Sequence, residues 1–146
     1  MRRSVSSPRP ALTLLELVIV LMIIGLVAII ALREVGRYLD RLAVRSAVAE
    51  AAMVVARARD EALARHVFVS VRIDTSRATL ALRARGQPLA VHALGHAHGV
   101  SISTTRDSLA FDVRGLGYGA SNLTLVARRG RAADTLVVSR LGRVRY

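Results

Sequence analysis

The apolar positions of this chain begin with one long run. Between residues 11 and 32, a stretch of 22 residues, the only polar side chains are Thr13 and Glu16, and residues 17–32 carry no charge. At 1.5 Å per residue a helix of this length covers about 33 Å, enough to cross a hydrocarbon core of about 30 Å. The pattern predicts a transmembrane helical segment over residues 12–32.

A helical period continues behind this run. Apolar residues recur there at steps of three, four and seven, while most of the neighbouring arginines lie off the stripe. The stripe consists of Val35, Leu39, Leu42, Ala49, Ala52, Ala56 and Leu63. We therefore expect one helix from about residue 12 to residue 65, amphipathic over 33–66. Its apolar stripe is expected to pack against the C-terminal part of the chain.

After His66 the period changes to two. Val67, Val69, Val71 and Ile73 alternate with more polar residues, which predicts a half-buried strand. Further strands are expected at 79–84, 89–93, 100–103, 109–113, 123–127, 136–139 and 143–146. Short strands at this spacing predict a small antiparallel sandwich or a pair of sheets over residues 67–146. The expected fold class is α+β, with a long N-terminal helix followed by a small antiparallel β domain.

Composition narrows the chemistry that this chain can perform. All 22 of its basic residues are arginines, against 10 acids, and it has no lysine and no cysteine. Lysine Schiff bases, disulfides, thiolate nucleophiles and cysteine zinc sites are thereby excluded. His92, His96 and His98 lie close in sequence, but in an apparent loop without an accompanying carboxylate. We expect no catalytic residues, no metal and no cofactor.

The charges near the N-terminus indicate an orientation. Arg2, Arg3 and Arg9 precede the apolar run without any acid, so the positive-inside rule places the N-terminus in the cytoplasm and exports the rest. Glu16 lies inside the apolar run, where a carboxylate is costly. With Thr13 three residues earlier it fits a capping box, which leaves the basic leader and the long helix unexplained.

The run Thr-Leu-Leu-Glu that begins at Thr13 and ends at Glu16, set between a basic leader and an aliphatic run, resembles the class III signal of type IV pilins and pseudopilins. The resemblance implies that residues 1–11 are a leader, removed by a prepilin peptidase between Ala11 and Leu12. It also implies N-methylation of the new amine on Leu12. Glu16 would pair with that amine of a neighbouring subunit, so that Thr13 and Glu16 serve filament assembly. Ala11 and Leu12 stand where the family prefers Gly and Phe.

The C-terminal third adds a second resemblance. Phe111-x-x-x-Gly115, the strands at 123–126 and 135–139, and Gly-Arg-x-Arg at 142–145 follow one another in an order similar to the GspH/FimT family of minor pseudopilins. This implies a structural subunit of a type II secretion pseudopilus or a type IV pilus. The subunit would be a single-pass inner-membrane protein with a periplasmic β domain, and its partners would be other pilins.

The arginines near the C-terminus support an alternative. Arg128, Arg129, Arg131, Arg140, Arg143 and Arg145 are expected on adjacent strands, where they would form a basic edge able to engage DNA phosphates. Phe111, Tyr118 and Tyr146 would be the aromatics available for base stacking. The resemblance to FimT-like members implies DNA uptake in natural transformation as this alternative function. Solvated arginines without a ligand, and an anchored β domain unrelated to filaments, are the competing interpretations.

Overall fold

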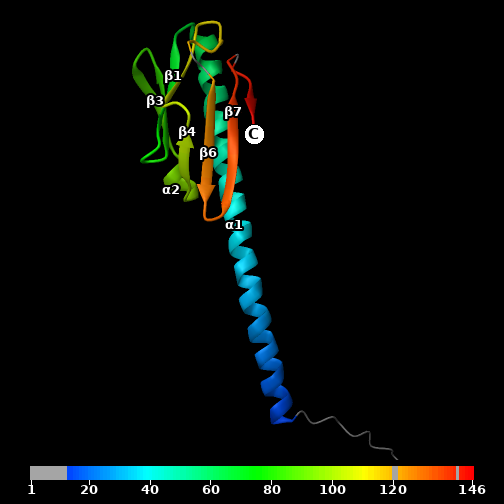
Figure 1. Cartoon of the computed structure of the whole chain (residues 1–146). Coiled ribbons are helices and arrows are strands. Elements are labelled where there is room, and N and C mark those ends of the chain that lie inside the picture. The colour runs from blue at the N-terminus through cyan, green and yellow to red at the C-terminus, as the bar shows by residue number, and fades with distance from the viewer. Residues whose placement is uncertain (1–12, 120–121, 141) are drawn as a thin grey trace, which may run out of the picture. The chain divides into compact units, whose positions relative to one another are not determined.

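The computed structural model describes residues 13–119, 122–140 and 142–146. Its elements are α1 (Leu14–Arg65), β1 (Val69–Asp74), β2 (Thr79–Ala84), β3 (Gln87–Ala93), α2 (Leu94–His98), β4 (Ser101–Thr104), β5 (Ser108–Phe111), β6 (Leu123–Arg129), β7 (Ala132–Val138) and β8 (Val144–Arg145) (Figure 1). The chain divides after Gly36 into two compact units, and α1 contributes to both. We call the second unit, residues 37–146, the head.

Helix α1 begins at a side-chain cap. The Glu16 backbone N–H donates to Thr13 Oγ1 at 3.2 Å, and the Leu17 N–H donates to the Thr13 carbonyl oxygen at 3.2 Å. Thr13 thus satisfies donors of the first turn that have no partner within the helix. From there the helix runs for 52 residues to Arg65, which confirms the single long helix that the periodicity predicts.

The buried face of α1 differs from the predicted stripe. Of that stripe only Ala52 is buried, and Leu39, Leu42 and Leu63 are 51%, 50% and 41% exposed. The buried residues are Val44, Ala47, Val48, Ala51, Ala52, Val54, Val55, Ala58 and Ala62. Alanine occurs on every side of this part of the helix, and leucines and a methionine lie on its exposed side, so hydropathy alone does not distinguish the faces. The sheets cover the face of small side chains.

The strands form two antiparallel sheets. One has the order β3-β2-β1-β5 and the other β4-β6-β7-β8, and all pairings are antiparallel. In β1 the residues Val69, Val71 and Ile73 are buried while Arg72 faces solvent, as the period of two predicts. The antiparallel pair of sheets behind a long helix confirms the expected α+β class.

Two differences from the predicted strands affect the chemistry of the head. Strand β7 begins at Ala132, not at residue 136, because its polar first half pairs with β6 across a tight hairpin. The short helix α2 occupies residues 94–98, where a loop was expected, and it carries His96 and His98.

Glycines of the C-terminal motif stand where the chain passes close to large side chains. A Cβ on Gly115, whose φ is +69°, would lie 2.8 Å from Leu63 Cγ. A Cβ on Gly142, whose φ is +75°, would lie 2.8 Å from Cε1 of the fully buried Phe111. Both positions therefore require glycine for backbone conformation and for space.

Candidate functional site

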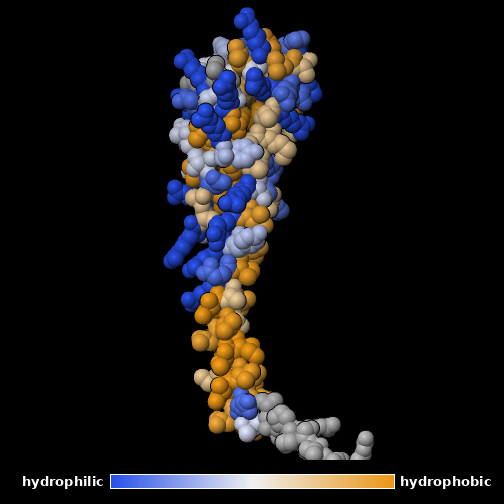
Figure 2. Space-filling view, turned by 90° about the vertical axis from the view of Figure 1, so that its right-hand side faces the viewer, coloured by the Kyte–Doolittle hydropathy of each residue, from blue (hydrophilic) through white to orange (hydrophobic). Residues whose placement is uncertain are grey.

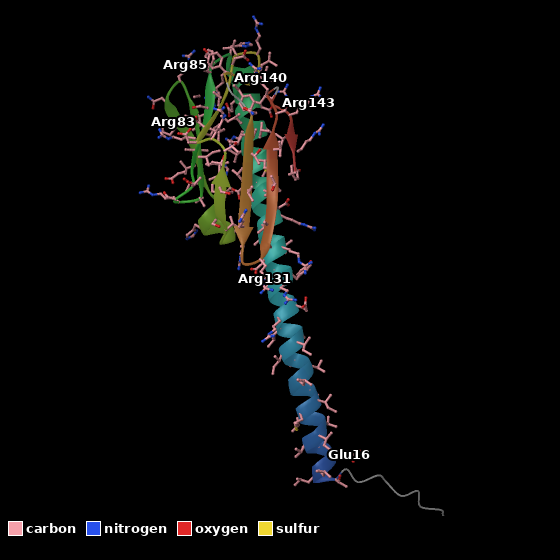
Figure 3. All side chains as sticks on the ribbon, in the orientation of Figure 1. Glu16, Arg83, Arg85, Arg131, Arg140 and Arg143 are labelled. Carbon is pink, nitrogen blue, oxygen red and sulfur yellow. The ribbon has the colours of Figure 1, made fainter. Side chains whose placement is uncertain are left out.

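The predicted processing residues lie at the edge of the described chain. Ala11 and Leu12, with the leader before them, are outside the described residues. Glu16 occupies the first turn of α1 and is exposed (Figure 3). The Glu16 carboxylate lies in the helix turn that carries the positive end of the helix dipole.

The apolar segment behind Glu16 has no packing partner within its own unit. Every residue from Leu14 to Leu32 is exposed, and Figure 2 shows this segment almost entirely in the hydrophobic colour. Among the described residues one helix, α1, is long and apolar enough to cross a membrane, and the 18-residue window that qualifies it is 0% buried. A continuous apolar surface of this kind marks a contact with lipid or with protein.

The six arginines of the predicted basic edge fall into two groups. Arg128, Arg129 and Arg131 lie at the β6–β7 hairpin. Arg140 and Arg143 follow the other end of β7, and Arg145 lies on β8 opposite Val137. Strand β7 has seven residues, which places the groups about 20 Å apart. Figure 3 shows Arg131 at one end of the head and Arg140 and Arg143 at the opposite end. Although the strands are adjacent, they do not bring the arginines together at one edge.

Arg129 is engaged inside the head. Its Nε lies 3.0 Å from Asp40 Oδ1, and its Nη1 donates to the His98 carbonyl oxygen at 2.8 Å. The guanidinium therefore ties β6 to α1 and to the end of α2. Sequence reasoning placed Arg129 in a DNA-binding set and missed this contact, because Asp40 and His98 are distant in the chain.

A carboxylate, that of Glu50, lies beside His92 and His98. The interpretation of this segment as a loop without an accompanying carboxylate is therefore wrong. His92 Nδ1 lies 2.9 Å from Glu50 Oε1, and His98 Nε2 lies 2.7 Å from Glu50 Oε2. The carboxylate thus bridges β3 and α2 to α1, and all three side chains are about one quarter exposed or less. His96 is exposed and does not take part.

Hydrogen bonding lowers the pKa of the Glu50 carboxyl. The hydrogen bond from His98 is the largest cause that lowers the pKa of Glu50 below its ordinary value of 4.5; partial burial acts in the opposite direction, and the His92 hydrogen bond lowers the pKa further. Glu50 is therefore an anion at neutral pH. In the part of the chain that the structure describes, no group of three or more His, Asp and Glu residues is arranged to hold a metal ion.

The aromatic side chains are placed differently from expectation. Phe111 is fully buried, so the interpretation of it as a stacking residue is wrong. Tyr118 and Tyr146 are 62% and 74% exposed. The Tyr118 ring makes an edge-to-face contact with Phe68, with centroids 5.1 Å apart and an interplanar angle of 79°.

Comparison with known proteins identifies the fold. No family model and no curated protein matches the sequence. Two crystal structures of the type IV minor pilin FimU from Pseudomonas aeruginosa strain PAO1 do match the structure. The one in space group P21 has a TM-score of 0.61 at 21% identity over 74% of this chain and 90% of that chain. The one in space group P65 has a TM-score of 0.56 at 19% identity, over 69% and 90%. The long apolar helix followed by antiparallel sheets is therefore the fold of a type IV pilin.

Proposed function

We propose that this protein is a minor pilin or pseudopilin, a structural subunit of a type IV pilus or of a type II secretion pseudopilus. The observation that carries the proposal is the wholly exposed apolar segment Leu14–Leu32 in front of a head with the pilin fold. In a pilin, one such segment serves two successive roles: it anchors the subunit in the membrane, and after assembly it packs in the filament core.

The energy of that surface supports the proposal. Fifteen large apolar side chains between Leu14 and Leu32 are exposed, each by 44% or more. At roughly 1 kcal/mol for covering each of them, leaving the segment in water costs on the order of 15 kcal/mol. This exceeds the whole stability of many domains, so the segment needs lipid or the helices of other subunits around it.

The remaining steps of the proposal concern processing and pairing. A prepilin peptidase removes residues 1–11, and the amine of Leu12 is methylated. The subunit waits in the inner membrane with its N-terminus cytoplasmic and its head periplasmic. The Glu16 carboxylate then pairs with the Leu12 amine of a neighbour, which sets the register of the packed helices more than it adds net stability.

Two measurements test this function in the native host. Mass spectrometry of the membrane fraction is expected to show a chain that lacks residues 1–11 when the prepilin peptidase is present, and the full chain when it is deleted. Glu16→Ala is expected to insert and to be cut, but to be depleted about tenfold or more from sheared filaments. The control Asp60→Ala, an exposed acid on the same helix, is expected to incorporate normally. An uncut chain, or a wild-type chain missing from sheared filaments, contradicts the proposal. Normal incorporation of Glu16→Ala contradicts the pairing role of Glu16.

A second candidate function, DNA binding by the same scaffold, is favoured by one observation. Figure 3 shows Arg83, Arg85, Arg140 and Arg143 toward the same end of the head. A hollow of about 520 Å³ at this end is lined by Gly117, Gly119, Asn122 and Arg140, next to the exposed Tyr118 in the chain. Guanidiniums together with an exposed aromatic ring suit a single nucleic-acid strand.

Salt dependence tests this second function. Each phosphate contact of a single strand contributes about 0.7 to the slope of log affinity against log salt. In neutral detergent, Arg140→Gln/Arg143→Gln is expected to reduce the slope for a single-stranded oligonucleotide by about 1.4, and Arg57→Gln/Arg72→Gln, two exposed arginines elsewhere, by less. The same slope for both double variants, or no retention of DNA at low salt, removes this function.

A further inference from the structure

A hollow in the head is bordered by three arginines. It has a volume of about 320 Å³ and lies between α1 and the β6–β7 hairpin. Its lining is Arg37, Asp40, Arg41, Gly130, Arg131 and Ala132. Arg131 stands at the turn of the hairpin beside α1 (Figure 3). None of these residues lies in the apolar segment, so the hollow belongs to the head alone.

The single acid of this hollow is already compensated. Asp40 pairs with Arg129 Nε at 3.0 Å. Gly130 makes the pair possible, because a Cβ at this position would stand 2.6 Å from Asp40 Oδ2. Its φ of +55° at the first turn position is that of a type II′ hairpin. The hairpin is thus held against the helix with the carboxylate turned to Arg129.

The cations on the other sides of the hollow therefore dominate its charge. Arg41 Nε donates to the Arg37 carbonyl oxygen at 3.3 Å, which keeps the guanidinium close to the helix surface. Among residues 13–119, 122–140 and 142–146, no carboxylate forms an ion pair with Arg41 or Arg131. Arg41 and Arg131 therefore make the hollow positively charged, since Asp40 is already paired with Arg129.

Guanidiniums arranged in this way suit a phosphate group. Their planar forks donate paired hydrogen bonds to phosphate oxygens and lose less hydration than an ammonium does. The volume exceeds what one inorganic phosphate fills, and the Ala132 methyl and the arginine stems supply apolar wall beside the charges. The ligand that fits is a phosphodiester with a small polar head and an attached apolar part.

We propose that this hollow binds the headgroup of an anionic phospholipid. The inference rests on the proposed function, in which the segment that ends at Leu32 spans the membrane. Arg37 follows Leu32 by five positions, a rise of about 8 Å in a helix, and Arg41 follows it by a rise of about 14 Å. The headgroup layer adds about 5–8 Å to each side of the hydrocarbon core. The arginines then stand at and just beyond the lipid phosphates, and hold the head at the membrane before assembly.

Lipid selectivity of the full chain tests the proposal. In neutral detergent micelles, fluorescence anisotropy with a labelled short-chain phosphatidylglycerol is compared with the matching phosphatidylcholine. We expect at least tenfold tighter binding of phosphatidylglycerol. Since a basic residue at an anionic surface is worth a factor of about five, Arg41→Gln/Arg131→Gln is expected to weaken this binding about 30-fold. The control Arg106→Gln/Arg114→Gln removes the same charge from exposed positions elsewhere and is expected to change it less than twofold.

Several outcomes overturn the lipid site. Equal affinity for the two lipids does so, and so does an unchanged affinity in Arg41→Gln/Arg131→Gln. Displacement by inorganic phosphate at the lipid's own concentration shows a site for the free anion instead. A duplex oligonucleotide that competes better per phosphate assigns the hollow to nucleic acid. Failure of the filament proposal is seen in a different experiment. In that case the leader stays uncut or the chain is missing from sheared filaments, while the selectivity for phosphatidylglycerol persists.

Discussion

The Glu50 bridge yields the sharpest prediction about the head. Glu50→Ala removes two hydrogen bonds, at 2.9 Å from His92 and 2.7 Å from His98, and leaves both rings without the carboxylate. Hydrogen bonds to a charged group are worth about 1.5–3 kcal/mol each, and the partial exposure of all three side chains reduces this. We expect a loss of about 2–3 kcal/mol, which lowers the Tm of a head of this size by roughly 10 °C.

The assay is thermal unfolding of the full chain in neutral detergent at pH 7, followed by the circular dichroism of the sheets. The matched control is Glu61→Ala on the same helix, which removes only the 2.6 Å pair with Arg65, whose side chain is 55% exposed. Such a pair contributes about 0.5 kcal/mol or less. If Glu50→Ala and Glu61→Ala lower the Tm equally, Glu50 does not hold β3 and α2 against the helix.

The same bridge predicts a pH dependence with a definite sign. Because the folded protein holds the pKa of Glu50 below 4.5, the carboxylate adds stability above this pH and loses it as the pH falls through the lower folded pKa. The stability difference between the wild type and Glu50→Ala is therefore expected to be full at pH 6 and to shrink below pH 4.5. A difference that grows with acidification refutes the assigned direction.

Two further predictions use matched variants. Gly130→Ala places a methyl group against the Asp40 carboxylate at a φ of +55°, and we expect it to lower the free energy of chemical unfolding by about 2 kcal/mol. The control Gly119→Ala has a similar φ of +68°, but its Cβ would meet no atom within 4 Å, so it should lower the free energy of unfolding by about 1 kcal/mol. Ala58→Leu, on the buried face of α1, should destabilise the head by about 1–3 kcal/mol, while Ala56→Leu, on the exposed face, should be neutral. If Ala56→Leu destabilises the head more than Ala58→Leu does, the predicted stripe is the buried face after all.

The predicted apolar stripe of α1 forms an exposed surface of the helix. Leu39, Leu42 and Leu63 have the spacing of a packed face, and they are half-exposed in the isolated chain. In the proposed filament this surface is available to neighbouring helices, while the opposite alanine and valine face is covered by the sheets of the same chain.

Local pattern alone determined the long helix and the strands that follow it, but not the short helix α2 or the start of β7. The apolar run before residue 33, the helical period behind it and the period of two after His66 predict a long helix followed by strands, since each depends on residues only a few positions apart. The same reasoning found Thr13 at the helix start, because a cap is a contact across one turn.

Tertiary structure decided which side chains meet. The chain separates Glu50 from His92 by 42 positions and from His98 by 48, so nothing local signals that one carboxylate serves both rings. Likewise, the antiparallel course of β6 and β7 separates the arginines at the hairpin turn from those beyond the far end of β7. A sequence period determines which residues share a face of one element. Which face is buried, and which distant charges become neighbours, depends on how the sheets pack on the helix.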